Sequence, residues 1–308
     1  MKIQKWLNKN CPSLEGKTIV ITGTTSGIGL ETFKHLVALG ANIVVGVRNI
    51  KKAEEHIKSL NNLAETQKVS VFQLDLEDIS SIKTFASNIK TICPNGIYAL
   101  INNAGAYPNK SEILKYGYEK HFFVNFVAPL FLSNLLLPLL EKTKDSKLIF
   151  VSSISQYFVN INLNNIDFKN QKSKFKIYAN SKRWLTLVAL KLKQDLESKN
   201  SNVSINIIHP GITASSLFAP KDSNAKNARF KFLDAGERLL FPKTKKACLS
   251  EIYALYHTKS GNNWIGPSTF KVYGFPKFDK LKINNKIQKQ QITCSKIADK
   301  ILKYLDKM

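Results

Sequence analysis

Short apolar runs alternate with amphipathic segments along most of this chain. The runs are rich in β-branched residues, which is typical of buried strands, and they cover residues 17–22, 42–47, 69–74, 97–101, 147–151 and 203–208. Segments with helical periodicity lie at residues 26–39, 51–64, 80–89, 120–140 and 178–199. The alternation predicts a doubly wound α/β fold of the Rossmann type, a single domain whose parallel sheet is covered by helices on both faces.

The pattern also predicts where the domain begins and ends. We assign residues 16–278 to it, with residues 1–15 as an N-terminal extension and residues 279–308 as a C-terminal helical tail. Residues 214–246 are irregular and rich in Lys, Asn and Phe, and they follow the sixth predicted strand. Because ligands bind at the carboxyl edge of such sheets, we expect a lid there. The alternative is a variable surface excursion. A last strand and turn are expected at 264–276.

The longest apolar stretch, residues 124–140, is interrupted by Asn125, Pro129, Asn134 and Pro138. It falls short of a comfortable membrane span, so we expect a buried helix that bends at Pro129.

The charge of the chain is unusual, with 46 basic and 22 acidic residues and a formal net charge of +24. Only four of the basic residues are Arg, and the Lys are dispersed. Arg is the residue favoured for bidentate recognition of bases and phosphates, so this pattern argues against nucleic-acid binding. Dispersed solvated charge is the favoured interpretation, and weak peripheral contact with an anionic membrane stays open.

Four isolated cysteines, Cys11, Cys93, Cys248 and Cys294, form no metal-binding or disulfide pattern. They indicate a reduced, cytoplasmic setting and no metal site. The first 16 residues are polar and basic without an apolar run, so we expect no signal peptide.

A glycine-rich loop joins the first predicted strand to the first predicted helix. Glycines let the backbone approach a pyrophosphate closely, while the helix N-terminus offers free N–H groups and the positive end of a dipole. The residues expected to bind the cofactor there are Gly23, Thr25, Ser26, Gly27, Ile28 and Gly29.

Tyr178 and Lys182 lie one turn apart on a predicted helix. An ammonium beside a phenol favours the phenolate, so we expect Lys182 to lower the pKa of Tyr178 and make it a general acid/base. Such a pair is common by chance, and it gains weight from the motifs that precede it.

Three motifs in this order resemble the short-chain dehydrogenase/reductase family: Thr-Gly-x-x-x-Gly-Ile-Gly, Asn-Asn-Ala-Gly and Tyr-x-x-x-Lys, over roughly residues 16 to 275. The resemblance implies that Tyr178 is the general acid/base and that Lys182 also binds the nicotinamide ribose. It implies that Ser153 bonds the substrate oxygen and that Asn125 holds a water in a proton relay. Further cofactor contacts implied by the resemblance are Asp75, Leu76, Asn103, Ala104, Gly105, Pro210, Gly211 and Thr213.

Arg48 follows the second predicted strand, where NAD-selective folds place a carboxylate on the ribose 2′-hydroxyl. An Arg accommodates a 2′-phosphate instead, so we expect NADP(H) in preference to NAD(H). The alternative is a solvent-exposed loop Arg.

Ser153 and Tyr178 are 25 residues apart, a long insertion that resembles the retinol-dehydrogenase-like branch of the family. Residues 266–270 and 274–276 resemble the tail of the same branch. The resemblance implies an oxidoreductase that interconverts a hydrophobic aldehyde or ketone and an alcohol by hydride transfer. It leaves open assembly into a homo-oligomer. The alternatives are a non-catalytic NADP(H)-binding regulator or scaffold, and an enzyme of this fold with another net reaction.

Overall fold

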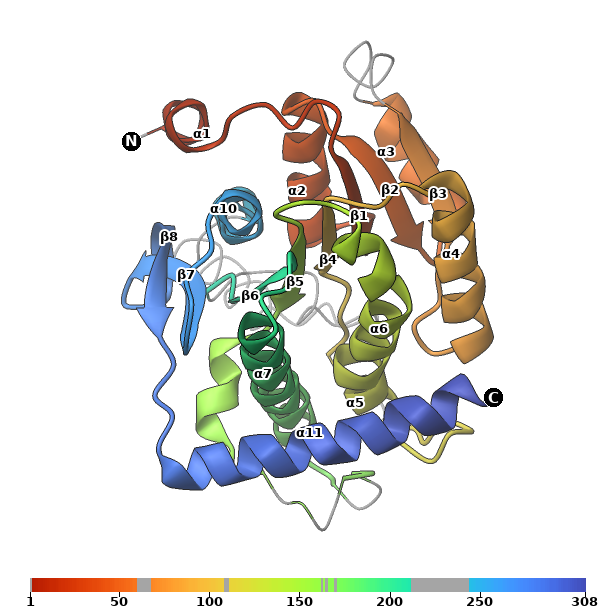
Figure 1. The fold of residues 1–308 in the computed structure, drawn as a ribbon, viewed down its shortest axis with the longest axis vertical. Coiled ribbons are helices and arrows are strands. Elements are labelled where there is room, and N and C mark those ends of the chain that lie inside the picture. The colour runs from red at the N-terminus through yellow and green to blue at the C-terminus, as the bar shows by residue number, and fades with distance from the viewer. Residues whose placement is uncertain are drawn as a thin grey trace, which may run out of the picture.

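Each apolar run of the sequence forms a strand of one sheet (Figure 1). The structure, a computed structural model, describes residues 2–59, 68–107, 111–161, 163, 166–168, 171–211 and 244–308. Its strands are β1 (Thr18–Thr22), β2 (Asn42–Val47), β3 (Val69–Gln73), β4 (Ala99–Asn102), β5 (Lys147–Val151), β6 (Ser204–Ile208), β7 (Asn263–Thr269) and β8 (Tyr273–Lys280).

The order of the described strands across the sheet is β3-β2-β1-β4-β5-β6-β7-β8. Strands β1 to β7 pair in parallel, and β8 pairs antiparallel with β7. The chain reverses its direction of travel across the sheet between β1 and β4, where a ligand crevice is expected at the carboxyl ends of the strands. The predicted doubly wound, single-domain α/β fold is confirmed.

Helices cover both faces of the sheet. Those in the described part of the chain are α1 (Ile3–Asn10), α2 (Gly27–Ala38), α3 (Ile50–Lys58), α4 (Ile79–Ile92), α5 (Lys120–Phe122), α6 (Ala128–Glu141), α7 (Lys174–Ser198), α9 (Thr244–Ala247), α10 (Leu249–Tyr256) and α11 (Asn285–Asp306). A π-helical turn, η2 (Phe123–Val127), joins α5 to α6, and a 3₁₀ turn, η3 (Ile154–Phe158), follows β5.

Alternate residues of each strand supply two separate cores. In β1, Val20 faces a core shared with α4, α6, α7 and α11, whereas Ile19 and Ile21 face a core shared with α1, α2 and α10. All three of these side chains are fully buried. A strand covered on both faces is apolar throughout, which is why the runs in the sequence are continuous rather than alternating.

The long apolar helix differs from its prediction in one respect. The irregularity lies at η2, which contains Asn125, and not at Pro129, which stands in the first turn of α6. Pro129 follows the point where the helical hydrogen-bond pattern already changes from the π-helical form of η2 to the α-helical form of α6. The helical run Lys120–Glu141 is long and apolar enough to span a membrane, but 78% of its apolar 18-residue window is buried inside the protein, so it packs as a core helix.

Both ends of the chain pack on the domain. In α1, the ring of Trp6 stacks on Phe275 with centroids 5.5 Å apart, and α11 lies across α7 and α6 (Figure 1). The predicted last strand proves to be the hairpin of β7 and β8. The predicted lid lies outside the described residues, apart from the residues 244–246 that begin α9. The proposed domain limits stay a prediction.

Candidate active site

A cavity of about 720 Å³ lies at the carboxyl ends of the parallel strands. Seven separate segments of the predicted site contribute residues to its lining. Those that line it are Gly23, Thr25, Ser26, Gly27, Ile28, Gly29, Arg48, Asp75, Leu76, Asn103, Ala104, Gly105, Ser153, Tyr178, Lys182, Pro210 and Gly211. Asn125 lies behind the lining, and Thr213 falls outside the described residues.

One end of the cavity is built from backbone packed against backbone. A Cβ on Gly29 would lie 2.2 Å from the carbonyl oxygen of Gly23 and 2.3 Å from Nδ2 of Asn103. Gly23 has a φ of +75°, and a Cβ there would lie 2.9 Å from Ala104. The Asn103 amide donates to the carbonyl oxygens of Thr22 and Gly23 at 2.7 and 2.9 Å. The two predicted motifs therefore hold each other in place, and only glycine fits at residue 29.

The N-terminus of α2 opens into this end of the cavity. Ser26 is the N-cap residue, but its side chain makes no capping hydrogen bond. The first N–H groups of a helix have no partner inside the helix, and the dipole places a partial positive charge there. An uncapped, glycine-lined helix N-terminus fits the pyrophosphate of a dinucleotide.

Charged side chains surround the next part of the cavity, at the ends of β2 and β3. Arg48, Asn49, Lys52 and Glu77 all line it. The carboxylate of Glu77 lies 3.5 Å from Nη1 of Arg48 and 3.9 Å from Nζ of Lys120. Neither Lys52 nor Glu77 was identified from the sequence. Arg48 and Lys52 thus share this part of the cavity with the carboxylates of Asp75 and Glu77, while Lys120 pairs more closely with Glu112, at 2.6 Å.

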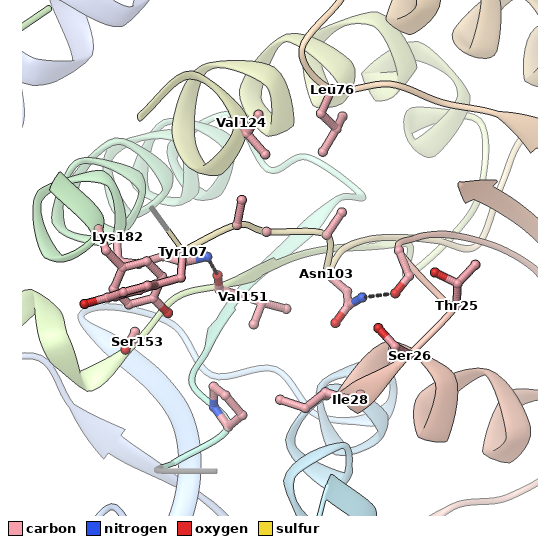
Figure 2. Close-up of a pocket in the computed structure, with 18 of the residues that line it drawn as sticks. Thr25, Ser26, Ile28, Leu76, Asn103, Tyr107, Val124, Val151, Ser153 and Lys182 are labelled. Atoms are coloured by element: carbon pink, nitrogen blue, oxygen red, sulfur yellow. Dashed lines mark hydrogen bonds between the residues drawn. The ribbon is translucent and has the colours of Figure 1, made fainter. Parts of the chain in front are cut away.

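The other end of the cavity is built from side chains. Figure 2 shows Lys182, Tyr107 and Ser153 gathered there, while Thr25, Ser26 and Ile28 lie at the opposite end. Ser153 is the N-cap of η3 and comes from the end of β5, whereas Tyr178 and Lys182 come from α7. The Lys182 ammonium donates to the carbonyl oxygen of Val151 at 2.8 Å.

The protonation of this end differs from the sequence-based expectation. Burial raises the pKa of Tyr178 to about 12, although its hydrogen bond with Ser153 acts in the opposite direction. Burial lowers the pKa of Lys182 to about 8. The expected lowering of the Tyr178 pKa by Lys182 is wrong for this structure, because the ammonium is 5.9 Å from the ring centroid and bonds Val151 instead. Desolvation therefore dominates, and Tyr178 is a protonated phenol at neutral pH.

Asn125 supports the cavity from behind. Its Oδ1 accepts from the N–H of Ala106 at 2.7 Å, and its Nδ2 donates to the carbonyl oxygen of Ala106 at 2.8 Å and to Ser181 at 3.2 Å. A Cβ on Gly105 would lie 3.1 Å from Asn125 Oδ1 and 3.6 Å from Lys182 Nζ. Asn125 thus clamps the loop after β4 close to Lys182. Its π-helical backbone is a feature often found at functional sites.

Several apolar side chains at the mouth of the cavity were not identified from the sequence. Ile154, Phe158 and Phe175 line it, and the ring of Tyr107 lies 5.3 Å from that of Tyr178. Tyr107 could have been found, since it stands two residues after Gly105. Phe158 and Phe175 lie on opposite sides of the long insertion, so no local pattern brings them together.

Comparison with known proteins agrees with this geometry. The sequence model of the family described as short chain dehydrogenase matches residues 17–226. Human retinol dehydrogenase 11 is 32% identical over 220 residues, which cover 70% of this chain and 68% of that protein. Human polyprenol dehydrogenase is 28% identical over 211 residues, which cover 67% of this chain and 64% of that protein. The matched part thus spans just under two thirds of the length of polyprenol dehydrogenase.

A solved structure gives the same result for the fold. The crystal structure of an uncharacterized protein from Mycobacterium paratuberculosis superposes with a TM-score of 0.71 at 25% identity, covering 95% of each chain. The family match, the named relatives and the clustering of the three motifs around one cavity agree with each other. The chain belongs to the short-chain dehydrogenase/reductase family, in its retinol-dehydrogenase-like branch.

Proposed function

We propose that this chain is an NADP(H)-dependent oxidoreductase that interconverts an apolar aldehyde or ketone and its alcohol. The observation that carries the proposal is the cavity with two chemically distinct ends. The uncapped N-terminus of α2 lies at one end, and Tyr178, Ser153 and Lys182 lie at the other. A dinucleotide is the kind of ligand that needs both ends at once.

The residues at the reacting end support proton transfer to a carbonyl oxygen. Bound NADP(H) would supply hydride to the carbonyl carbon or accept it from the alcohol. Tyr178 is protonated, because burial raises its pKa to about 12, and it can donate to the oxygen that gains charge. Ser153, hydrogen-bonded to Tyr178, can donate to the same oxygen and orient it.

In the oxidation direction, Tyr178 must accept a proton, and burial works against that. Lys182 lies on the same helix with a pKa lowered to about 8, so it can exchange its proton near neutral pH. Asn125 holds the loop that packs against Lys182. We propose that Lys182 passes protons between Tyr178 and solvent, with Asn125 keeping its surroundings in place.

The preference for NADP(H) rests on the charged group at the ends of β2 and β3. Arg48, Lys52 and the helix start that Asn49 caps all lie on the cavity, and a 2′-phosphate would gain charge-assisted hydrogen bonds from them. Asp75 and Glu77 oppose this preference, although Nη1 of Arg48 lies 3.5 Å from the Glu77 carboxylate and offsets part of its charge.

The apolar substrate class rests on the mouth of the cavity, where Ile154, Phe158 and Phe175 offer no charge to a substrate. The relatives are named retinol and polyprenol dehydrogenases, after alcohols with long apolar chains.

The test is NADPH oxidation by the whole chain over a panel of aldehydes and ketones of increasing chain length. We expect turnover with NADPH to exceed that with NADH, and kcat/KM to rise with chain length. Tight NADPH binding without oxidation on any carbonyl would favour the regulator or scaffold instead. Turnover that is equal with both cofactors would refute the preference for NADP(H).

A further inference from the structure

The turn between β7 and β8 has an unusual sequence for its backbone. The N–H of Val272 donates to the carbonyl oxygen of Thr269 at 3.0 Å, which closes a tight turn inside the three-residue loop between Thr269 and its strand partner Tyr273. The two central residues, Phe270 and Lys271, have φ values of +48° and +60°. Two positive φ values define a turn that prefers Asn-Gly, and a bulky side chain in this region is strained. The chain therefore accepts strain to place a Phe at this tip.

The ring that this turn presents has almost no protein contact. Phe270 is 85% exposed. The neighbouring Lys271 places its ammonium 5.3 Å from the ring centroid of Tyr157 in η3. The next residue, Phe158, is 70% exposed, and its ring lies 6.4 Å from that of Phe175, which is 43% exposed. We call Phe158, Phe175 and Phe270 the aromatic rim, because the first two line the mouth of the cavity.

Three exposed lysines flank Phe175 of the aromatic rim. Lys172, Lys174 and Lys176 are all exposed and alternate along the segment that contains Phe175. No acidic residue lies between residues 171 and 177. Exposed aromatic side chains interleaved with Lys are typical of surfaces that bury rings among lipid headgroups and attract anionic lipids. The charge is complementary to an anionic membrane.

We infer that the aromatic rim docks on an anionic lipid bilayer, with the mouth of the cavity facing the membrane. The rings of Phe158, Phe175 and Phe270 enter the headgroup region, and the three lysines lie over lipid phosphates. The inference rests on the proposed function in one respect: an apolar substrate dissolved in the bilayer then reaches Tyr178 without crossing water. Strain at Phe270 is retained because an Asn there would stabilise the turn but remove the ring.

The experiment is co-sedimentation of the whole chain with vesicles of phosphatidylcholine alone or with added phosphatidylserine, at low and physiological salt. The wild type should prefer the vesicles with phosphatidylserine. Phe270→Asn should lower the partition coefficient about tenfold, because one buried ring is lost. Its melting temperature should stay the same or rise, since Asn tolerates positive φ. Joint replacement of Lys172, Lys174 and Lys176 by Gln should lower binding about 100-fold and weaken its salt dependence.

Two matched controls come from elsewhere on the surface. Tyr304→Asn removes a ring that is 54% exposed on α11, and Lys90→Gln removes an exposed charge on α4. Figure 1 places α4 at the edge of the sheet opposite β7 and β8. Both variants should bind vesicles like the wild type.

Three results would overturn the inference. One is unchanged vesicle binding by Phe270→Asn. Another is a fall in its melting temperature that accompanies the loss of binding, which would make Phe270 a structural residue. The third is a dimer in gel filtration that Phe270→Asn dissociates while vesicles bind neither protein, because the rim would then meet a second copy. Turnover of a water-soluble aldehyde should be unchanged in Phe270→Asn. If the wild type and every variant fail to oxidise NADPH with any carbonyl of the panel, the proposed function is refuted and the vesicle result still stands.

Discussion

The two ends of the cavity are built by different means. At the dinucleotide end, contacts form between backbone atoms. Only glycine is allowed at position 29, because a Cβ there would clash with its neighbours. At the reacting end, side chains from β5 and α7 meet, and burial decides their protonation. Steric exclusion depends on the few residues of one loop, whereas desolvation depends on every element packed around a group. The first end is encoded locally and the second is a property of the whole fold.

The largest effect should come from filling the dinucleotide end. Gly29→Ala places a Cβ where the oxygen of Gly23 and the amide of Asn103 already lie, so the loop proposed to bind the pyrophosphate must change its shape. We expect NADPH affinity, measured by fluorescence titration, to fall by about 100-fold or more. Gly261→Ala is the control, since that residue lies away from the cavity, with φ at +78° and no close neighbour. It should destabilise the fold modestly and bind NADPH normally, and normal binding by Gly29→Ala would contradict the account.

A second prediction concerns pH and the helix that carries the glycine loop. Glu251 of α10 is fully buried, and its Oε2 accepts from the hydroxyl of Thr32 in α2 at 2.5 Å. Burial raises the pKa of Glu251 from 4.5 to about 7. As pH rises, the unfolded state therefore releases this proton at a lower pH than the folded state does. This contribution to stability is complete below pH 4.5 and is lost as pH rises through 7, by about 3 kcal/mol.

Glu251→Gln removes that titration. Urea unfolding between pH 5 and 8 should show that the wild type loses more stability with rising pH than the variant. Glu54→Gln, an exposed carboxyl on α3, is the control and should behave like the wild type. Parallel pH profiles for Glu251→Gln and the wild type would show that the carboxyl does not titrate in this range.

The smallest effects concern cofactor choice, because the charges at the ends of β2 and β3 are partly solvated. Arg48 is 64% exposed. Arg48→Ala should weaken NADPH binding about tenfold more than NADH binding, and Glu77→Gln should strengthen NADPH binding a few-fold. Both shifts should shrink at high salt. Lys51→Ala, an exposed neighbour that does not line the cavity, should change neither cofactor. Equal effects on the two cofactors would refute a phosphate contact.

The same contrast explains what the sequence could predict. The strands and the doubly wound order follow from apolar runs, since a strand covered on both faces needs one continuous run. The glycine loop and Asn103 were identified because their motifs are short and the contacts between them are backbone contacts. The π-helical turn around Asn125 was not predicted, because the sequence there carries no helix-breaking residue. The bend was expected at the nearby Pro129 instead.

Side-chain electrostatics were the least predictable part of the site. A spacing of four residues shows that Tyr178 and Lys182 share a helix face, but not that Lys182 bonds Val151 or that burial outweighs its charge. Glu77 was missed for a similar reason. It follows β3, and only the parallel pairing of β3 with β2 brings it to Arg48. Such contacts cross between elements and leave no local pattern.

The most direct test of the reacting end is single-turnover oxidation of bound NADPH by Tyr178→Phe with a reducible aldehyde. We expect a rate about 100- to 10,000-fold below that of the wild type, because the proton donor is gone, with NADPH affinity nearly unchanged. Tyr304→Phe, at an exposed position of α11, should react at the wild-type rate. A Tyr178→Phe variant that oxidises bound NADPH as fast as the wild type would contradict the assignment of Tyr178 as the proton donor.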